Sequence, residues 1–410
     1  MALFTTLCSG LLTLGAAIDS VPLGPLEDGL SDKEWQAIRQ SIGDAAVVGI
    51  GETNHGSHDI AVAKIALVQS LVERHGAEIL FIEASVGDGL ALNAYAMGQR
   101  DDLRAILDNL PLWMFQTQEF ESLMRWIRRH NQRTKKPLRV CGIEMQYVGR
   151  VLHRLRAETG AAAQAFGTFP VERIAGKVAP AKQFDFLWQP MDGDTLDAYW
   201  QLLRRLRGWL ASKTGPKGPK RRAFAERLVR VVEQFTLAMA QSEEGSKHQL
   251  RDFHMFENLT WFRQHYGNPR AVLWAHNEHV WRREGNGGVD VLGRQLGKAL
   301  GEDYFAIGVD FGRGAYRAPS AKGWVHTVGR APADSLTAKL LRRGRPHAFT
   351  PVRGAAMRVF AETERLRTSA GGYAPYDDDG RLQEMSTMSV TDRYDAILSV
   401  ATSSPSIALE

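Results

Sequence analysis

Short apolar runs alternate along this chain with longer segments that have helical patterns, and this alternation limits the fold more than any other feature. The apolar runs lie at 45–50, 77–83, 138–144, 270–277 and 303–312. Such alternation is typical of βαβ units arranged around a parallel sheet. The sequence therefore predicts an α/β fold with a central, mainly parallel sheet flanked by helices.

The segment 57–76 has the clearest helical pattern. Its apolar residues at helical spacing are Ile60, Ala63, Leu67, Val68 and Leu71. Ser57 stands where a hydroxyl caps a first turn, and Gly76 stands where a helix ends. We expect further helices at 87–98 and 117–131.

The middle of the chain changes character. Helical patterns at 196–210 and 221–241 flank the breaker-rich loop 212–222. This organisation predicts an α-helical subdomain, 151–262, inserted between an N-terminal part, 1–150, and a C-terminal part, 263–410, of one α/β domain. The apolar stretch at 394–400 is predicted to be an edge strand.

Composition excludes several classes of function. The 410 residues are 44% hydrophobic and 24% charged, which is typical of a globular protein, and the net charge of +5 is small for this length. There is no basic stripe with interleaved aromatic residues, so we expect no nucleic-acid partner. No apolar run reaches the roughly 18 residues that a membrane-spanning helix needs, so we expect no membrane partner. The sequence does not indicate an oligomeric state.

Cysteine content and the first residues indicate a cytoplasmic protein. The only cysteines are Cys8 and Cys141, with no C-x-x-C pattern. Residues 2–17 are largely apolar, but the first basic residue is Lys33, so the charged region of a signal peptide is missing. We predict that 2–17 form a first helix packed on the domain; an export signal is the alternative.

Polar residues follow several predicted strands where each strand ends. These residues are Glu52, Glu83, Glu144, His276 and His279. Carboxyl ends of parallel strands share one edge of a sheet, where α/β proteins bind ligands. A single carboxylate there is commonly a helix cap, but several together predict a common pocket.

The segment GETNHGSHDI, 51–60, supplies the chemistry of this pocket. His55 is suited to act as a general base, and Glu52 can fix its tautomer and stabilise its charged form. His58 and Asp59 either contribute to the pocket or face solvent from the first helical turn. There is no G-x-S-x-G motif, so the sequence favours water over serine as the nucleophile.

A metal site is the competing interpretation of the same residues. His55, His58, Asp59, His276 and His279 together offer nitrogen and oxygen ligands that suit zinc or manganese. There is no H-E-x-x-H motif, however. We therefore predict no cofactor and keep a divalent metal as the alternative.

With these residues identified, the chain resembles the erythromycin esterase family over most of its length. The motifs that carry the resemblance, in order, are VVGIGETNHGSHDI, LFIEASVGDGLALNAY, WMFQTQEFESLMRWIRRHN, RDFHMFENLTWF, VLWAHNEHV and LGRQLGKALGEDYFAIGVDFGRGA. Several motifs in the expected order are more specific than any one of them.

The resemblance implies a hydrolase related to enzymes that open macrolide lactones, in which a histidine activates water without a covalent acyl intermediate. His55 matches the catalytic base, Glu52 its partner, and His276 and His279 the histidines of the W-A-H-N block. Two positions depart from the family pattern. Lys64 stands where an arginine is common nine residues after the base, and Glu144 stands where many relatives have aspartate.

The predicted function is therefore cleavage of an ester or lactone, with a macrolide such as erythromycin as one candidate. The predicted catalytic residues are Glu52, His55 and His276. The predicted substrate-binding residues are His58, Asp59, Lys64, Glu83, Glu144 and His279. For Lys64 the alternative is a solvated position on its helix. Two other functions stay open: a biosynthetic tailoring enzyme that acts on an acyl, ester or lactone substrate, and a metal-binding or haem-binding protein of the same fold.

Overall fold

A computed structural model gives the three-dimensional structure of the chain. The residues it describes are 20–159, 191–285, 288–320, 322–341, 346–353, 364–367 and 385–410. The helix predicted at 2–17 lies outside them.

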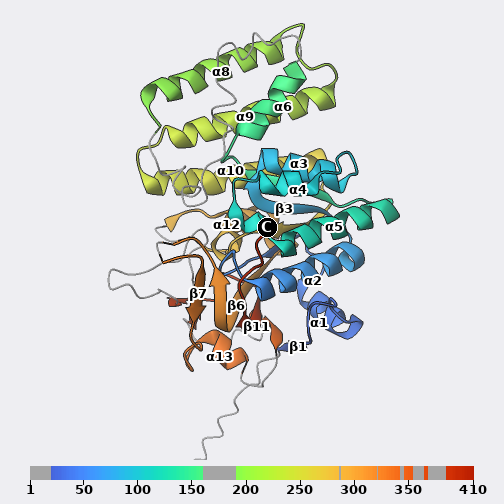
Figure 1. Ribbon diagram of the computed structural model, residues 1–410, viewed down its shortest axis with the longest axis vertical. Coiled ribbons are helices and arrows are strands. Elements are labelled where there is room, and N and C mark those ends of the chain that lie inside the picture. The colour runs from blue at the N-terminus through green and yellow to red at the C-terminus, as the bar shows by residue number, and fades with distance from the viewer. Residues whose placement is uncertain are drawn as a thin grey trace, which may run out of the picture.

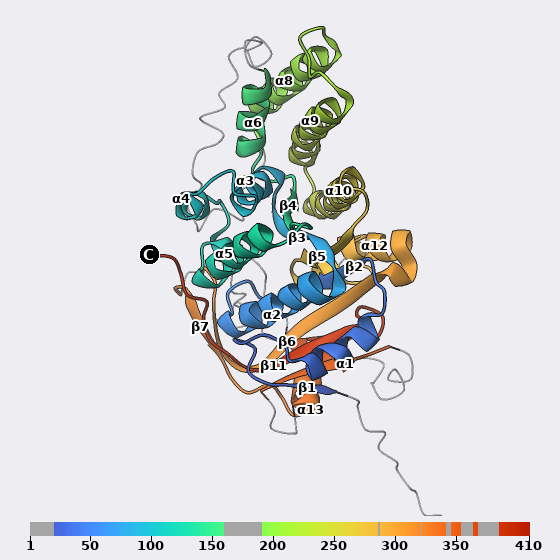
Figure 2. The same ribbon diagram turned by 90° about the vertical axis from the view of Figure 1, so that its right-hand side faces the viewer.

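A single large sheet forms the centre of the described structure (Figures 1 and 2). Its strands are β1 (Val21–Leu23), β2 (Val47–Ile50), β3 (Ala77–Ser85), β4 (Arg139–Glu144), β5 (Arg270–Trp274), β6 (Tyr304–Arg317), β7 (Val325–Val328), β8 (His347–Pro351) and β11 (Ala396–Ser403). The order is β1-β8-β11-β6-β2-β5-β3-β4, with β7 paired to β6. The pairs from β11 through to β4 are parallel, and β1, β7 and β8 pair antiparallel. The α/β prediction with a mainly parallel sheet is confirmed.

The prediction of an edge strand at 394–400 is wrong. β11 lies inside the sheet, parallel to β6 on one side and antiparallel to β8 on the other. Its residues from Ala396 to Val400 are all buried. A continuous apolar run is what a strand covered on both faces requires, whereas an edge strand usually carries charges.

Helices cover both faces of the sheet. The remaining elements are α1 (Asp32–Ile42), α2 (His58–His75), α3 (Val86–Ala96), α4 (Leu103–Asp108), η1 (Trp113–Phe115), α5 (Gln118–Arg133), α6 (Gly149–Thr159), α8 (Gly193–Ala211), α9 (Pro219–Met239), α10 (Glu244–His265), α11 (Asn277–Val280), α12 (Leu292–Leu300), η5 (Gly301–Asp303) and α13 (Leu336–Leu340), with a separate hairpin of β9 (Glu364–Arg367) and β10 (Met385–Met388). No described helix has the length and apolar character needed to cross a membrane.

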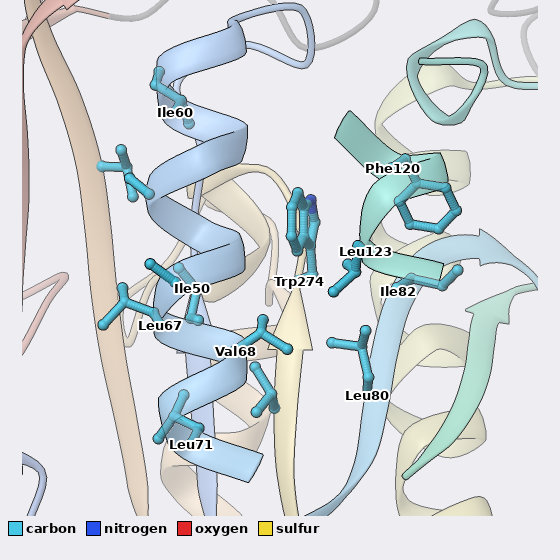
Figure 3. Packing of buried hydrophobic residues seen from close by; sticks show 14 of the residues in the cluster. Ile50, Ile60, Leu67, Val68, Leu71, Leu80, Ile82, Phe120, Leu123 and Trp274 are labelled. Carbon is cyan, nitrogen blue, oxygen red and sulfur yellow. The ribbon is translucent and has the colours of Figure 1, made fainter. Parts of the chain in front are cut away.

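Helix α2 positions the loop that precedes it. Ser57 caps it, since its hydroxyl accepts a hydrogen bond from the Ile60 amide, and Gly76 ends it with a φ of 78°. Figure 3 shows its apolar face, with Leu67 and Val68, packed against Ile50 of β2 and Trp274 of β5. The second face of the sheet carries a separate core that includes α10 and α12. Because α2 is fixed to the sheet in this way, the loop between β2 and α2 has a defined place.

Among the residues that the structure describes, four helices, α6, α8, α9 and α10, come between β4 and β5, where the insert was predicted. The first three extend away from the sheet in Figure 1, and α10 packs beside β4. The proposed boundaries at 150 and 262 stay a prediction.

Candidate active site

Glu52, Glu83, Glu144 and His276 lie at one edge of the sheet. Glu52 comes two residues after β2, Glu83 lies near the end of β3, Glu144 ends β4, and His276 comes two residues after β5. Because β2, β3, β4 and β5 are parallel neighbours, their carboxyl ends meet at this edge. The side chains there form two groups, which we call the His55 cluster (Glu52, His55 and Lys64) and the Arg251 cluster (Glu83, Glu144, Arg251, Asp252 and His279).

In the His55 cluster, Glu52 binds both of its basic neighbours. Nδ1 of His55 lies 2.6 Å from Oε1 of Glu52, and Nζ of Lys64 donates to Oε2 at 2.7 Å. Burial opposes the charge of Glu52, but Lys64 and His55 outweigh it and lower the pKa of the carboxyl. Nε2 of His55 has no hydrogen bond to any described residue. One ring nitrogen is therefore fixed and the other is left to react.

Lys64 lies inside the protein. Its side chain is 0% exposed, and Nζ also lies 3.4 Å from the carbonyl oxygen of Ala275 and 4.2 Å from the ring centre of Trp274. Helical side chains lean toward the N-terminus, which brings Nζ back to Glu52. Burial lowers the pKa of Lys64 to about 8, against the opposing effect of Glu52. The alternative of a solvated Lys64 is wrong.

The sequence analysis missed Arg251, the central residue of the Arg251 cluster. Its guanidinium donates from Nε to Glu144 at 2.6 Å and from Nη2 to Glu83 at 2.7 Å. Burial opposes its charge, but the two carboxylates outweigh burial and raise the pKa of Arg251. Burial raises the pKa of Glu144. Burial also opposes the charge of Glu83, but His279 and Arg251 outweigh it and hold the pKa of Glu83 well below its usual range.

A sequence signal for Arg251 did exist. Arg251 is in helical register with the buried residues Met255, Leu259 and Phe262 of α10. A charged residue on an apolar stripe needs a buried partner of opposite charge. That argument could have predicted an ion pair from α10, although not its partners.

His279 completes the Arg251 cluster. Its Nδ1 lies 2.8 Å from Oδ1 of Asp252, and its Nε2 lies 3.3 Å from Oε1 of Glu83. Burial and Arg251, whose Nη1 lies 3.0 Å from Nε2, oppose a charge on this ring. Asp252 and Glu83 outweigh them and raise the pKa of His279 to about 10.

His276 lies between the two clusters. Its backbone amide donates to Glu83 at 2.8 Å, and its ring centre is 5.5 Å from that of His55. Burial, with a further contribution from His55, lowers the pKa of His276 to about 4. The ring is therefore neutral at pH 7, and its Nε2 lies 3.3 Å from the carbonyl oxygen of Thr53.

The structure gives His58 and Asp59 other partners. Nδ1 of His58 lies 2.6 Å from Oε1 of Glu119, and the carboxylate of Asp59 accepts hydrogen bonds from the amide and hydroxyl of Ser404. The Asp59 contacts hold Ser404 to α2, and the Ile407 amide donates to Glu119 of α5. A contact of His58 or Asp59 with substrate stays a prediction.

The proposed metal ligands do not converge. His58, Asp59 and His279 bind Glu119, Ser404 and Asp252 respectively. Within the described ranges, no group of three or more His, Cys, Asp or Glu side chains has an arrangement that could hold a metal ion.

A small cavity lies beside the His55 cluster. Its lining includes Glu52, His55, Ser57, Thr117 and Ser406, with apolar walls from Ala61, Met114, Phe115, Phe120 and Trp274. It leaves about 20 Å³ of room for the centre of a water molecule. A second hollow, with about 370 Å³ of such room, lies at α10 and α12 and is lined by Leu250, Phe253 and Gln295, among others.

Comparison with known proteins identifies the family of the chain. The model of the family named Erythromycin esterase matches residues 72–403. The chain belongs to the erythromycin esterase family. The matched range contains Glu83, Glu144, Arg251 and His276 but begins after His55, so the His55 cluster rests on the geometry described above.

Individual relatives are distant in sequence. The Bacillus subtilis (strain 168) protein YbfO, whose name places it provisionally among hydrolases, is 22% identical over 416 residues, which cover 93% of this chain and 89% of that protein.

Three solved structures share the fold. A Bacillus cereus protein has a TM-score of 0.78 at 20% identity, covering 95% of this chain and 97% of its own. A succinoglycan biosynthesis protein has a TM-score of 0.76 at 20% identity, covering 95% of each chain. A mutant of the erythromycin esterase EreC in its open conformation has a TM-score of 0.68 at 14% identity, covering 94% of this chain and 98% of its own.

Proposed function

We propose that this family member hydrolyses an ester or lactone with a water molecule that His55 deprotonates. The observation that carries the proposal is the state of the His55 ring. Glu52 holds Nδ1 at 2.6 Å, which fixes the tautomer with a proton on Nδ1 and a lone pair on Nε2. A histidine whose Nδ1 is held by a buried carboxylate, and whose Nε2 has no partner among the described residues, is suited to act as a general base.

The reaction follows from this arrangement. Nε2 of His55 takes a proton from water, the water oxygen bonds to the carbonyl carbon, and the bond from that carbon to the alkoxy oxygen breaks. The proton passes from Nε2 to the leaving alkoxide, so the products are a carboxylic acid and an alcohol. Glu52 stabilises the imidazolium, and Lys64 keeps Glu52 ionised.

The other candidate residues position these groups. Glu83 holds the backbone of His276, and Arg251 holds Glu83 and Glu144. A macrolide lactone is one candidate substrate, because the fold is shared with EreC. The likeness to a succinoglycan biosynthesis protein favours a second candidate, a biosynthetic tailoring enzyme that acts on an acyl, ester or lactone substrate, for example by acyl transfer to an alcohol.

A substrate panel with a matched pair of variants tests the proposal. The purified protein is offered aryl esters, simple lactones and erythromycin, and carboxylic acid release is measured. We expect His55→Ala to lose roughly 10²- to 10⁴-fold in kcat without unfolding. His58→Ala, at the first residue of α2 and paired with Glu119, is the control and should lose less than about threefold; a larger loss would support its predicted contact with substrate.

Activity of His55→Ala close to that of the parent would contradict the mechanism. A parent that releases no acid, but forms a new ester when an alcohol is added, would favour the acyl-transfer alternative.

A further inference from the structure

Segment 404–409 runs beside the loop that carries His55. The Ser406 amide donates to the carbonyl oxygen of Gly56 at 2.8 Å, and the His58 amide donates to that of Ser404 at 2.8 Å. Ser57 and Pro405 form a β-bridge between these two contacts. Ser406 is thus held next to the residue that follows His55.

The same segment contacts the opposite wall of the small cavity. The Gln118 amide donates to the carbonyl oxygen of Ile407 at 2.8 Å, and the Leu409 amide donates to that of Gln116 at 3.1 Å. Figure 2 shows the end of the chain, marked C, beside α5. Segment 404–409 therefore joins the beginning of α2 to the beginning of α5 and closes the cavity between them.

Close packing fixes the position of Ser406 relative to His55. The carbonyl oxygen of Gly56 accepts from Ser406 and also from the Arg317 amide at 2.9 Å. A Cβ atom on residue 56 would lie 1.6 Å from the carbonyl oxygen of Arg317, so only glycine fits between these segments. This loop has no space in which to shift away from Ser406.

Three hydroxyls line the cavity, and two of them have partners. Ser57 accepts from the Ile60 amide, and Thr117 accepts from the Phe120 amide. Ser406 is only 6% exposed, and its Oγ is buried without a hydrogen-bond partner among the described residues. Of the three hydroxyls, Ser406 is therefore the one with neither its donor nor its acceptor capacity used by a described residue.

The cavity has the size and chemistry of a site for one water molecule. A buried hydroxyl without a partner is unfavourable, and an ordered water commonly satisfies such a group. About 20 Å³ of room for a water centre exceeds the roughly 10 to 15 Å³ that one water requires. His55 lines the same cavity and has Nε2 free, whereas both oxygens of Glu52 are occupied.

We propose that the hydroxyl of Ser406 binds the water molecule that His55 deprotonates. The inference rests on the proposed hydrolysis and assigns its nucleophile a binding site. Oγ of Ser406 donates to the water oxygen, and one water proton is directed at Nε2 of His55. That proton moves to Nε2 as the water oxygen bonds to the carbonyl carbon, and it leaves with the alcohol, while Ser406 keeps its own proton.

Two serine variants on the same segment test this role. In Ser406→Ala, kcat should fall about five- to tenfold, as expected for the loss of one hydrogen bond, with KM unchanged. The melting temperature should not fall, because the hydroxyl that is removed has no protein partner. Ser404→Ala, which loses only the hydroxyl contact with Asp59 outside the cavity, should keep kcat within about twofold.

Equal losses in the two variants would overturn the proposal, because they would show that the segment acts only as a structural brace. A kcat for Ser406→Ala within about twofold of the parent would also overturn it.

A crystal structure of the parent protein gives a readout that does not depend on activity. We expect a water within hydrogen-bond distance of both Ser406 Oγ and His55 Nε2, and no water at that position in crystals of Ser406→Ala. If the water is present but no ester is cleaved, the proposed function fails while the binding site stands. A parent structure without this water contradicts the site itself.

Discussion

The His55 cluster and the Arg251 cluster lie at the same edge of the sheet, yet they use their charges differently. In the Arg251 cluster each basic side chain contacts two carboxylates: Arg251 contacts Glu83 and Glu144, and His279 contacts Asp252 and Glu83. In the His55 cluster a single carboxylate binds two basic side chains, and Nε2 of His55 has no partner among the residues that the structure describes. A cluster whose bases are all paired fixes geometry, and a cluster with an open nitrogen can move a proton.

The two clusters should therefore fail in different ways when they are mutated. Replacing His55 should affect the rate and leave stability nearly unchanged. Replacing Arg251 should affect stability first.

The largest effect on stability is expected from Arg251→Met. This change leaves Glu83 and Glu144 buried without their cation, and breaking a buried ion pair from one side typically costs about 3 to 5 kcal/mol. Urea denaturation measures the loss. The control is Arg230→Met, which removes a half-exposed pair with Glu233 and Glu257 and should cost less than about 1 kcal/mol. Equal losses in the two variants would remove the distinction between the clusters.

A smaller effect is expected from pH through Lys64. Its pKa of about 8 means that the ammonium loses its proton as pH rises through that value, and Glu52 then lacks its cation. Activity should fall on the alkaline side of about pH 8, and in Lys64→Arg this decline should move to higher pH because a guanidinium stays charged. Profiles of kcat against pH for both proteins decide this.

The contribution of Lys64 to stability should rise with pH over the range in which activity falls. Because the pKa of Lys64 is lowered on folding, the unfolded chain binds more protons between about pH 8 and the unfolded pKa near 10.4. Stability therefore rises with pH across this window.

If kcat declines at the same alkaline pH in the parent and in Lys64→Arg, Lys64 does not control the pH dependence of kcat.

The smallest effect is expected from metal removal. If His55 activates water by itself, prolonged chelation should leave kcat within about twofold of its starting value. Elemental analysis before and after chelation is the control for removal. Loss of activity that zinc or manganese restores would instead place a metal at the open side of the His55 cluster.

Much of the fold could be predicted from the sequence, because each apolar run and each helix pattern is a local signal. The rule for parallel strands predicts the shared edge of the sheet, and it predicts from the sequence that Glu52, Glu83 and Glu144 lie in one region. The contact between His55 and Glu52 could also be predicted, because His55 is only three positions after Glu52 in the chain.

Contacts between distant segments could not be predicted in this way. Arg251 comes from α10, more than a hundred residues beyond Glu144, and nothing local names its partners. The prediction of an edge strand at 394–400 is wrong because a pattern of apolar residues does not specify the order of strands in a sheet. Ser406 gave no local signal, since its importance lies in its contact with Gly56.

The central place of β2 has a consequence for folding. Val47 pairs with Ala271 on one side and with Tyr304 on the other, both more than two hundred residues further along the chain. Closing such long loops is slow, and β2 has neither neighbour while the ribosome is still making the first half of the protein. The loop that carries His55 is thus synthesised early, but the two strands that hold β2 in place are synthesised late. After dilution from denaturant, catalytic activity should return with the slowest kinetic phase, well after the helical circular dichroism signal.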